Sequence, residues 1–235
     1  MRDTIKNLDY FENRLRFLNT SIDEFEQLIA ENINSEKVNL RSGYLTLLGY
    51  YTSKINCIYS MGMPIESIIS IYPKYLDLFS KTWNKETGSY IQLVVTVSLG
   101  ILIDMTKEQI NQISDLLKKE SFQDYFIDYL LHQIDNNWEI RTDKFAFPIP
   151  YELLNTVLNA NDNKDAIYNL SIYLDKEWYN GHSDAGWYNS HKSSHDIYTG
   201  YWSYESAALA KLLQLDDREL KNSPYYPYDL VHYNN

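Results

Sequence analysis

Apolar residues recur at every third or fourth position along most of the chain, and this spacing is typical of one face of an α-helix. The pattern predicts a long first helix whose apolar stripe runs from Ile5 to Ile29. A second helix is expected from about Leu40 to Met61, where Gly62 ends it, and a third from Pro64 to about Trp83. The other face of the first helix is acidic, so we expect it to meet solvent or a basic partner.

The run from Ile91 to Ile103 is apolar on nearly every side, which indicates a buried central helix. Its β-branched residues would also suit a strand, but the neighbouring segments have the helical period and offer no strand partner. Thr106 and Gln109 have the spacing of a capping box and predict the start of the next helix. Ser121 is expected to cap the helix that follows.

The helical period fails between residues 135 and 150, where asparagines and prolines mark a long connection. We therefore divide the chain into an N-terminal helical part, residues 1–134, and a C-terminal helical part, residues 135–235, expected to form one compact unit. In the second part, helices are predicted at about 151–159, 164–179 and 204–215.

The predicted fold is all-α, either a helical bundle or a stack of antiparallel helical hairpins. Residues 178–202 break the helical pattern and are expected to form one long structured loop, rich in aromatic residues and histidines. Residues 223–233 are too rich in proline for a helix, so they predict a non-helical C-terminal tail laid onto the body of the protein.

A metal site is the first chemistry that the 178–202 segment suggests. His191 and His195 have a helical i, i+4 spacing, and His182 lies nearby in the sequence, so the three imidazoles resemble a ligand set for a hydrolytic zinc ion. A metal-dependent hydrolase using these histidines is the alternative function. The segment contains no His-Glu-x-x-His motif, and the adjacent serines are poor helix formers, which favours a structural role.

Acid–base catalysis is a second reading of the same segment, because His182 could pair with Glu177, Asp184 or Glu205 as a general base. No nucleophile elbow, phosphate-binding loop or dinucleotide motif accompanies these residues. An aromatic platform for a ligand is a third reading, but tryptophans that flank a loop usually anchor it to the core. If the loop is structural, its tryptophans should be buried and its histidines bonded to protein groups.

The acidic composition disfavours some classes of binding partner and favours others. A formal net charge of −11 and a pI near 4.9 disfavour direct contact with a phosphate backbone. The same charge favours a basic protein partner, and the 22 tyrosines are compatible with an interface. The single cysteine, Cys57, has apolar neighbours and is expected in the core. With no secretory leader and no membrane span in the sequence, a cytoplasmic location is expected.

Three long C-terminal motifs resemble the PoNi family of immunity proteins. They are Leu174-Asp-Lys-Glu-Trp-Tyr-Asn-Gly-His-Ser-Asp-Ala-Gly-Trp-Tyr-Asn-Ser-His-Lys192, Gly200-Tyr-Trp-Ser-Tyr-Glu-Ser-Ala-Ala208 and Ser223-Pro-Tyr-Tyr-Pro-Tyr-Asp-Leu-Val-His232. The opening Met1-Arg-Asp-Thr4 is also similar to the start of that family, and the rest of the N-terminal half matches as a helical pattern.

This resemblance implies an all-α cytoplasmic protein without enzymatic activity, metal or cofactor. It would bind a cognate PoNe-type DNase toxin of the PD-(D/E)xK class, used in competition between bacteria, and would neutralise it without touching nucleic acid or membrane. The family signature would comprise Trp178, Gly181, His182, Asp184, Gly186, Trp187, His191, Trp202, Glu205, Tyr225, Tyr226, Pro227, Tyr228 and Asp229.

A DNase presents a positive cleft to DNA, so an acidic protein can be steered to that cleft and place carboxylates where phosphates would lie. The natural contacts would be acidic residues on outer helix faces. The candidates for toxin binding are Asp162, Asp165, Glu177, Asp184, Asp196, Asp216, Asp217 and Glu219.

Overall fold

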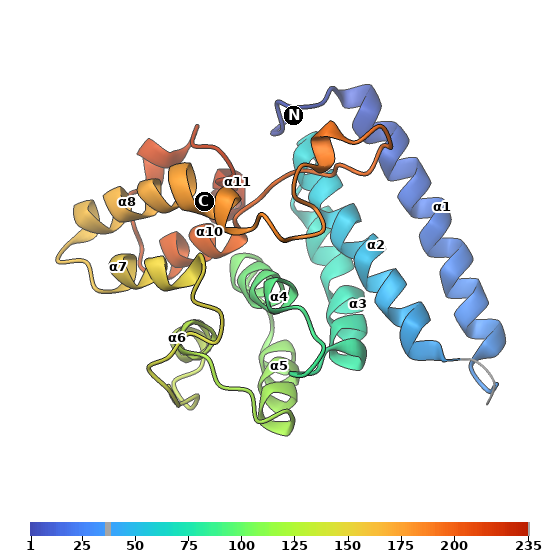
Figure 1. Ribbon diagram of the computed structural model, residues 1–235, viewed down its shortest axis with the longest axis horizontal. Coiled ribbons are helices and arrows are strands. Elements are labelled where there is room, and N and C mark those ends of the chain that lie inside the picture. Colours follow the sequence, from blue (N-terminus) through green and yellow to red (C-terminus); the bar gives the residue numbers. More distant parts are fainter. Residues whose placement is uncertain (36–38, 235) are drawn as a thin grey trace. The chain divides into compact units, whose positions relative to one another are not determined.

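The computed structural model describes residues 1–35 and 39–234 of the 235-residue chain. Within these residues the regular elements are helices and no β-strand occurs (Figure 1), so the predicted all-α class is confirmed. The contacts between Cα atoms group the chain into two compact units, residues 1–83 with 189–201 and residues 84–188 with 202–235. The division expected at residue 135 stays a prediction.

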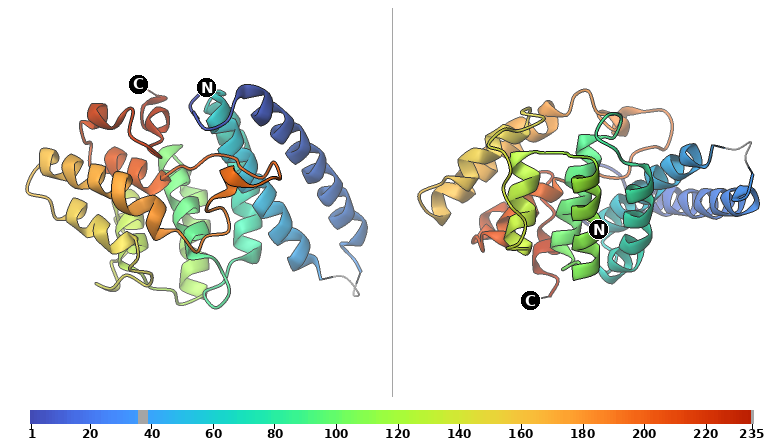
Figure 2. Two further views of the ribbon diagram at one scale, coloured as in Figure 1. Left: turned by 45° about the horizontal axis from the view of Figure 1, so that its top comes forward. Right: turned by 90° about the horizontal axis from the view of Figure 1, so that it is seen from below.

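Three consecutive helices form most of the first unit: α1 (Leu8–Asn32), α2 (Leu40–Met61) and α3 (Glu66–Thr82). They lie side by side, with α2 packed against both of the others (Figures 1 and 2). Their facing surfaces bury apolar and aromatic side chains, as the helical period predicts. This burial is the main source of stability for the three helices.

Single residues determine where α1 begins and where α2 ends. Asn7 caps α1 by accepting a hydrogen bond from the amide of Tyr10. Gly62 ends α2 as predicted, because its left-handed backbone (φ 79°) lets its amide bond the carbonyl of Tyr59. Ile5, expected at the start of the apolar stripe of α1, lies before the helix and is 46% exposed. The buried stripe therefore begins only at Phe11.

Residues 189–201 return to the first unit and close over the helix ends there. The hydroxyl of Ser60, in α2, donates to the carbonyl of Thr199 at 2.9 Å. The hydroxyl of Tyr10, in α1, donates to the carbonyl of Tyr198 at 3.0 Å, and the Tyr198 hydroxyl donates to the carboxylate of Asp3. These bonds hold an irregular segment in place where no helix supplies backbone partners.

The second unit is centred on α4 (Tyr90–Leu102), which packs against α6 (Tyr125–Ile134) and α10 (Tyr204–Leu212). Most residues of α4 are buried, which confirms the buried helix predicted from its apolar run. The next helix, α5 (Lys107–Lys119), begins with the predicted capping box, in which Thr106 and Gln109 bond each other's backbone amides.

The start of α6 differs from the prediction. Ser121 has a left-handed backbone (φ 50°), and Asp124 caps the helix instead, accepting from the amide of Ile127 at 2.8 Å. The buried Asp124 carboxylate also accepts from the hydroxyl of Tyr90 at 2.9 Å and from the amide of Ala146 at 2.7 Å. The 135–150 connection is therefore bonded to the N-terminus of α6, and an aspartate suits the positive end of a helix dipole.

The C-terminal helices are short and partly irregular. Residues 151–158 form a 3₁₀ turn, η1 (Tyr151–Leu154), that leads into α7 (Asn155–Leu158). The long helix predicted next is α8 (Asn163–Ile172), which continues as a π-helical segment, η2 (Tyr173–Trp178), and then as α9 (Tyr179–Gly181).

The predicted loop and tail contain further short turns. The 3₁₀ turn η3 (Ser190–Lys192) interrupts the loop, and η4 (Asp217–Leu220) follows α10. The tail was expected to be non-helical throughout, but α11 (Tyr228–His232) forms within it. Pro227 occupies the N-cap of α11, so the proline lies outside the helix and blocks none of its hydrogen bonds.

Candidate functional site

Signature residues from two distant motifs meet in one aromatic cluster of the second unit. The Trp178 and Trp187 rings stack with centroids 5.4 Å apart and planes 19° apart. Tyr225, from the tail, lies 4.8 Å from Trp178 and stacks on Tyr179 at 5.3 Å. Tyr225 has a left-handed backbone (φ 65°) where its ring contacts Trp178 and Tyr179. The tail is therefore attached to residues 178–188 through ring contacts.

His182 lies inside this cluster and is 2% exposed. Its Nδ1 atom is 2.6 Å from the carbonyl oxygen of Trp178, and its Nε2 atom is 2.9 Å from the hydroxyl of Tyr151. The carbonyl accepts, so Nδ1 carries the proton and Nε2 accepts from the tyrosine. Both ring nitrogens are thus engaged by protein groups, which leaves neither for a metal ion or a substrate.

Gly181 is required by the close approach of the 148–150 segment. A Cβ atom at this position would lie 2.6 Å from the Cβ of Pro150, far inside a normal contact. Only a residue without a side chain lets these two segments touch. The signature glycine therefore fixes the position of the loop before η1, whereas a Cβ at Gly186 would meet nothing within 4 Å.

The other two histidines do not form the predicted helical pair. The helical turn η3 ends at Lys192, so His191 and His195 share no helix face. The Nδ1 atom of His191 lies 2.8 Å from the hydroxyl of Tyr201, and burial lowers the pKa of its imidazole. His195 is exposed. Among residues 1–35 and 39–234, no three His, Cys, Asp or Glu side chains are grouped so that they could hold a metal ion.

The expectation of buried tryptophans and bonded histidines is met in part. Trp178 is buried, whereas Trp187 and Trp202 are half-buried. His182 and His191 are bonded to protein groups, whereas the exposed His195 lies in a bend of the chain. The segment is thus folded in around residue 182 and more open around residue 195.

Two buried carboxylates of the C-terminal part, Glu205 and Asp217, have structural partners. Glu205, which is 2% exposed, accepts from the hydroxyl of Tyr173 at 2.9 Å, and burial raises the pKa of that tyrosine. Asp217, which is 1% exposed, accepts from the hydroxyl of Tyr226 at 2.6 Å and lies 2.7 Å from Nε2 of His232. Asp217 was predicted on an outer surface, and this prediction is wrong, because its carboxylate joins η4 to the tail.

The other acidic candidates remain at the surface. Asp162 caps α8 by accepting from the amide of Asp165 at 2.9 Å. Asp216 is paired with the guanidinium of Arg218, which lowers the pKa of its carboxyl group. Glu177 is half-buried, and the exposed candidates are Asp162, Asp165, Asp184, Asp216 and Glu219 in the second unit and Asp196 in the first.

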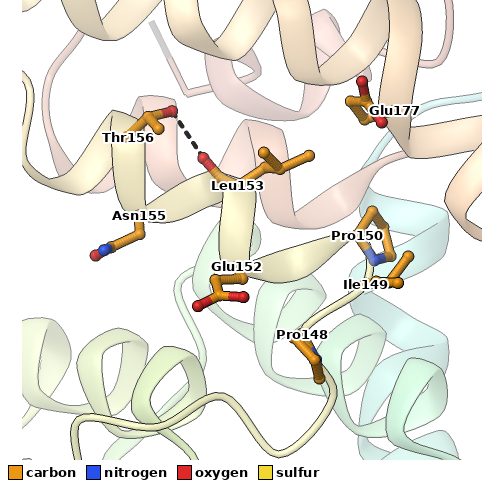
Figure 3. A pocket seen from close by; sticks show the side chains of 8 residues that line it. All are labelled: Pro148, Ile149, Pro150, Glu152, Leu153, Asn155, Thr156 and Glu177. Carbon is orange, nitrogen blue, oxygen red and sulfur yellow. Dashed lines mark hydrogen bonds between the residues drawn. The ribbon is translucent and has the colours of Figure 1, made fainter.

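Two surface grooves of the second unit bring some of these candidates together with apolar residues. We call the first the apolar groove; it has a volume of about 480 Å³ and is lined by Pro148, Ile149, Pro150, Glu152, Leu153, Asn155, Thr156 and Glu177 (Figure 3). We call the second the acidic groove; it has a volume of about 580 Å³ and is lined by Asn163, Lys164, Ile167, Tyr168, Ser171, Asp175, Asp216, Glu219, Leu220 and Ser223.

Sequence reasoning missed several groove residues. Asp175 was not among the candidates, although it lines the acidic groove beside Asp216 and Glu219. Ile149, the most exposed large apolar side chain of the described residues at 77%, was not singled out either. An isoleucine between two prolines is a signal that could have been used, because the residue before a proline is disfavoured in a helix and connecting loops lie at the surface.

Both halves of the chain match models of one protein family. The N-terminal model of the PoNe immunity proteins (PoNi) matches residues 2–115, and the C-terminal model matches residues 122–230. The chain belongs to the PoNi family. The C-terminal match contains every signature residue named from the sequence. Many of these PoNi residues pack or form hydrogen bonds within the fold, as in the aromatic cluster.

The fold also occurs in a crystal structure. Protein PA2201 from Pseudomonas aeruginosa is 19% identical, with a TM-score of 0.72 over 97% of this chain and 88% of that one. At this identity the likeness concerns the fold alone. None of the curated proteins compared with this PoNi chain matches it. In the part of the chain that the structure describes, no helix combines the length and the hydropathy that crossing a membrane requires.

Proposed function

We propose that this immunity protein neutralises a cognate PoNe-type DNase toxin by binding it in a stoichiometric complex. The single observation that carries the proposal is the match of both halves of the chain to PoNe immunity protein models. The net charge of −11 supports it, because a protein that binds DNA must present a positive surface that an acidic partner can occupy.

The geometry supports binding more than catalysis. His182 has both ring nitrogens engaged, and Glu205 and Asp217 are buried in hydrogen bonds to tyrosines. These buried polar groups thus hold the fold together, and no nucleophile with an adjacent base is found among them. We therefore infer a non-enzymatic inhibitor that needs no metal or cofactor, which disfavours the metal-dependent hydrolase.

The proposed site of action is the cytoplasm, where a toxin would meet chromosomal DNA. The acidic surface would repel nucleic acid, so we propose that the protein contacts the toxin and not its DNA substrate. Exposed carboxylates of the second unit, including Asp162, Asp165, Asp184 and Glu219, are the proposed contacts, with Asp196 as a candidate in the first unit.

Co-expression in a toxin-sensitive bacterium tests the proposal. The cognate PoNe-type toxin is induced alone or together with the immunity protein, and viable counts and chromosomal DNA integrity are followed. We expect the toxin alone to degrade DNA and kill the cells, and co-expression to restore both survival and intact DNA. Continued DNA degradation at equal expression of both proteins would overturn the proposal.

A further inference from the structure

One helical rod in the second unit separates the two grooves. It consists of α8, η2 and α9, and α8 contacts both α7 and η4. Figure 1 shows α7 and α8 side by side. The apolar groove includes residues of η1 and α7, and the acidic groove includes residues of η4. The rod is thus the ridge between them.

The π-helical part of the rod sends one carboxylate into each groove. Asp175 lines the acidic groove, and Glu177, two residues later, lines the apolar groove. In Figure 3, Glu177 reaches the apolar groove from η2, whereas the other lining side chains belong to residues 148–156. Segments of π-helix are rare, cost helix regularity and occur frequently at functional sites.

The apolar groove combines exposed apolar area with carboxylates that have no internal partner. Ile149 is 77% exposed and Leu153 is 44% exposed. Within the described residues, the side-chain carboxylates of Glu152 and Glu177 form no hydrogen bond or ion pair. Pro150, which lines this groove, lies against Gly181. An apolar anchor flanked by basic side chains fits such a surface.

The acidic groove offers a second set of available charges. Within the described residues, the side-chain carboxylates of Asp175 and Glu219 form no hydrogen bond or ion pair, whereas the Asp216 carboxylate is paired with Arg218. Lys164 offsets one of the three carboxylates that line this groove. The Tyr168 side chain is 64% exposed at the edge, where its ring can serve as an aromatic contact.

We propose that the two grooves and the α8–η2 ridge form one docking surface for the basic, DNA-binding face of the nuclease toxin. The apolar groove would take an apolar anchor of the toxin, with Glu152 and Glu177 bonded to flanking Lys or Arg. Asp175 and Glu219 would bind basic side chains across the ridge. This inference rests on the proposed function and adds to it the site and the chemistry of the toxin segment that enters it.

The acidic face of α1 in the first unit is the competing location. Asp23, Glu24 and Glu31 lie exposed along it, but Glu26 is already occupied by Lys74 at 3.0 Å and by the hydroxyl of Tyr51. The observations therefore favour the second unit, where exposed apolar side chains and unpaired carboxylates line the same grooves. The face of α1 supplies matched control positions.

The test is a set of charge reversals measured against the cognate PoNe-type toxin carrying an inactivating substitution. Asp175→Lys, Glu177→Lys and Glu219→Lys each reverse the charge of one groove carboxylate. Ile149→Ser removes the exposed apolar side chain from the apolar groove. Glu24→Lys in α1 and Asp115→Lys in α5 make the same charge change at exposed positions outside the grooves. Dissociation constants are measured by titration calorimetry, and thermal unfolding establishes that each variant is folded.

We expect each groove reversal to weaken binding about tenfold or more, and Ile149→Ser to weaken it about fivefold or more. The controls should stay within about twofold of the wild type. Should a reversal fail to fold, Asp175→Asn and Glu177→Gln remove the charge without adding one and should still weaken binding.

The outcomes separate this inference from the function on which it rests. A wild-type protein that does not bind the toxin overturns both. A wild-type protein that binds, with groove variants no weaker than the controls, overturns the docking surface and leaves the proposed function standing. A larger loss from Glu24→Lys than from the groove variants would place the interface on α1 and likewise overturn the docking surface.

Discussion

Single residues of the C-terminal part act mainly by making close packing possible. Gly181 permits contact with Pro150, His182 bridges Tyr151 to the backbone at Trp178, and Asp217 bonds the tail. Gly181 has no side chain, and His182 and Asp217 are buried and hydrogen-bonded. Their replacement should therefore reduce the stability of the fold more than it reduces toxin binding.

Gly181→Ala should destabilise the protein by about 1–3 kcal/mol, because the added Cβ overlaps Pro150 and the segments must move apart. Gly186→Ala is the control, since its Cβ would meet no atom within 4 Å. Urea unfolding followed by circular dichroism measures both. Equal urea midpoints for the two variants would show that the segments around Gly181 and Pro150 can move apart with no loss of stability, and would contradict this prediction.

His191 makes a defined contribution to pH dependence. Burial and the nearby Lys192 and Lys6 lower the pKa of its imidazole in the folded protein, so the unfolded chain binds a proton more readily. The stabilisation is fully present above the unfolded pKa near 6.5 and is lost as pH falls through the folded pKa. NMR titration should give a value below 6.5, and His191→Gln should lose less stability than the wild type on acidification.

At the scale of elements, sequence patterns predicted the regular helices well, because apolar spacing and caps are local signals. Gly62 and Thr106 fix helix ends through bonds to residues close in sequence, and both were predicted. Ser121 was mistaken for a cap because propensity does not reveal that its backbone is left-handed. The helix α11 was missed because Pro227 was read as a breaker when it stands just outside the helix.

The site was less predictable than the helices. The signature motifs were identified from the sequence, but the pairings of the buried carboxylates join residues that are not neighbours in the sequence: Glu205 bonds Tyr173, and Asp217 bonds His232. Neither pairing produces a periodic pattern in the sequence from which it could be predicted. The π-helical η2 also has no spacing signal of its own, so the separate directions of Asp175 and Glu177 could be seen only in the structure.

Asp124 links two elements, and its replacement tests that link. Asp124→Ala removes the cap of α6 and the bonds to Tyr90 and Ala146, so we expect a loss of about 2–4 kcal/mol in the free energy of unfolding. Asn7→Ala, which removes one exposed cap from α1, should cost about 1 kcal/mol. Denaturant titration compares the two, and equal losses would contradict the linking role of Asp124.

At the scale of the whole molecule, the net charge should influence how quickly the protein encounters the proposed basic toxin. A charge of −11 should accelerate encounter with a positive nuclease, and salt should screen this attraction. We expect the association rate constant for the toxin to fall about tenfold or more between about 0.02 M and 0.5 M NaCl, with a smaller change in the dissociation rate. Stopped-flow fluorescence measures both, and a salt-independent association rate would contradict electrostatic steering.

The most direct test of neutralisation is a titration of DNA cleavage. A fixed amount of the purified active toxin is mixed with increasing amounts of the immunity protein, and plasmid cleavage is measured on a gel. Stoichiometric binding predicts that cleavage falls in proportion to the added protein and ends near one molar equivalent. Full cleavage at a large molar excess would contradict neutralisation by binding, and inactivation of the toxin by a small fraction of an equivalent would show enzymatic action instead.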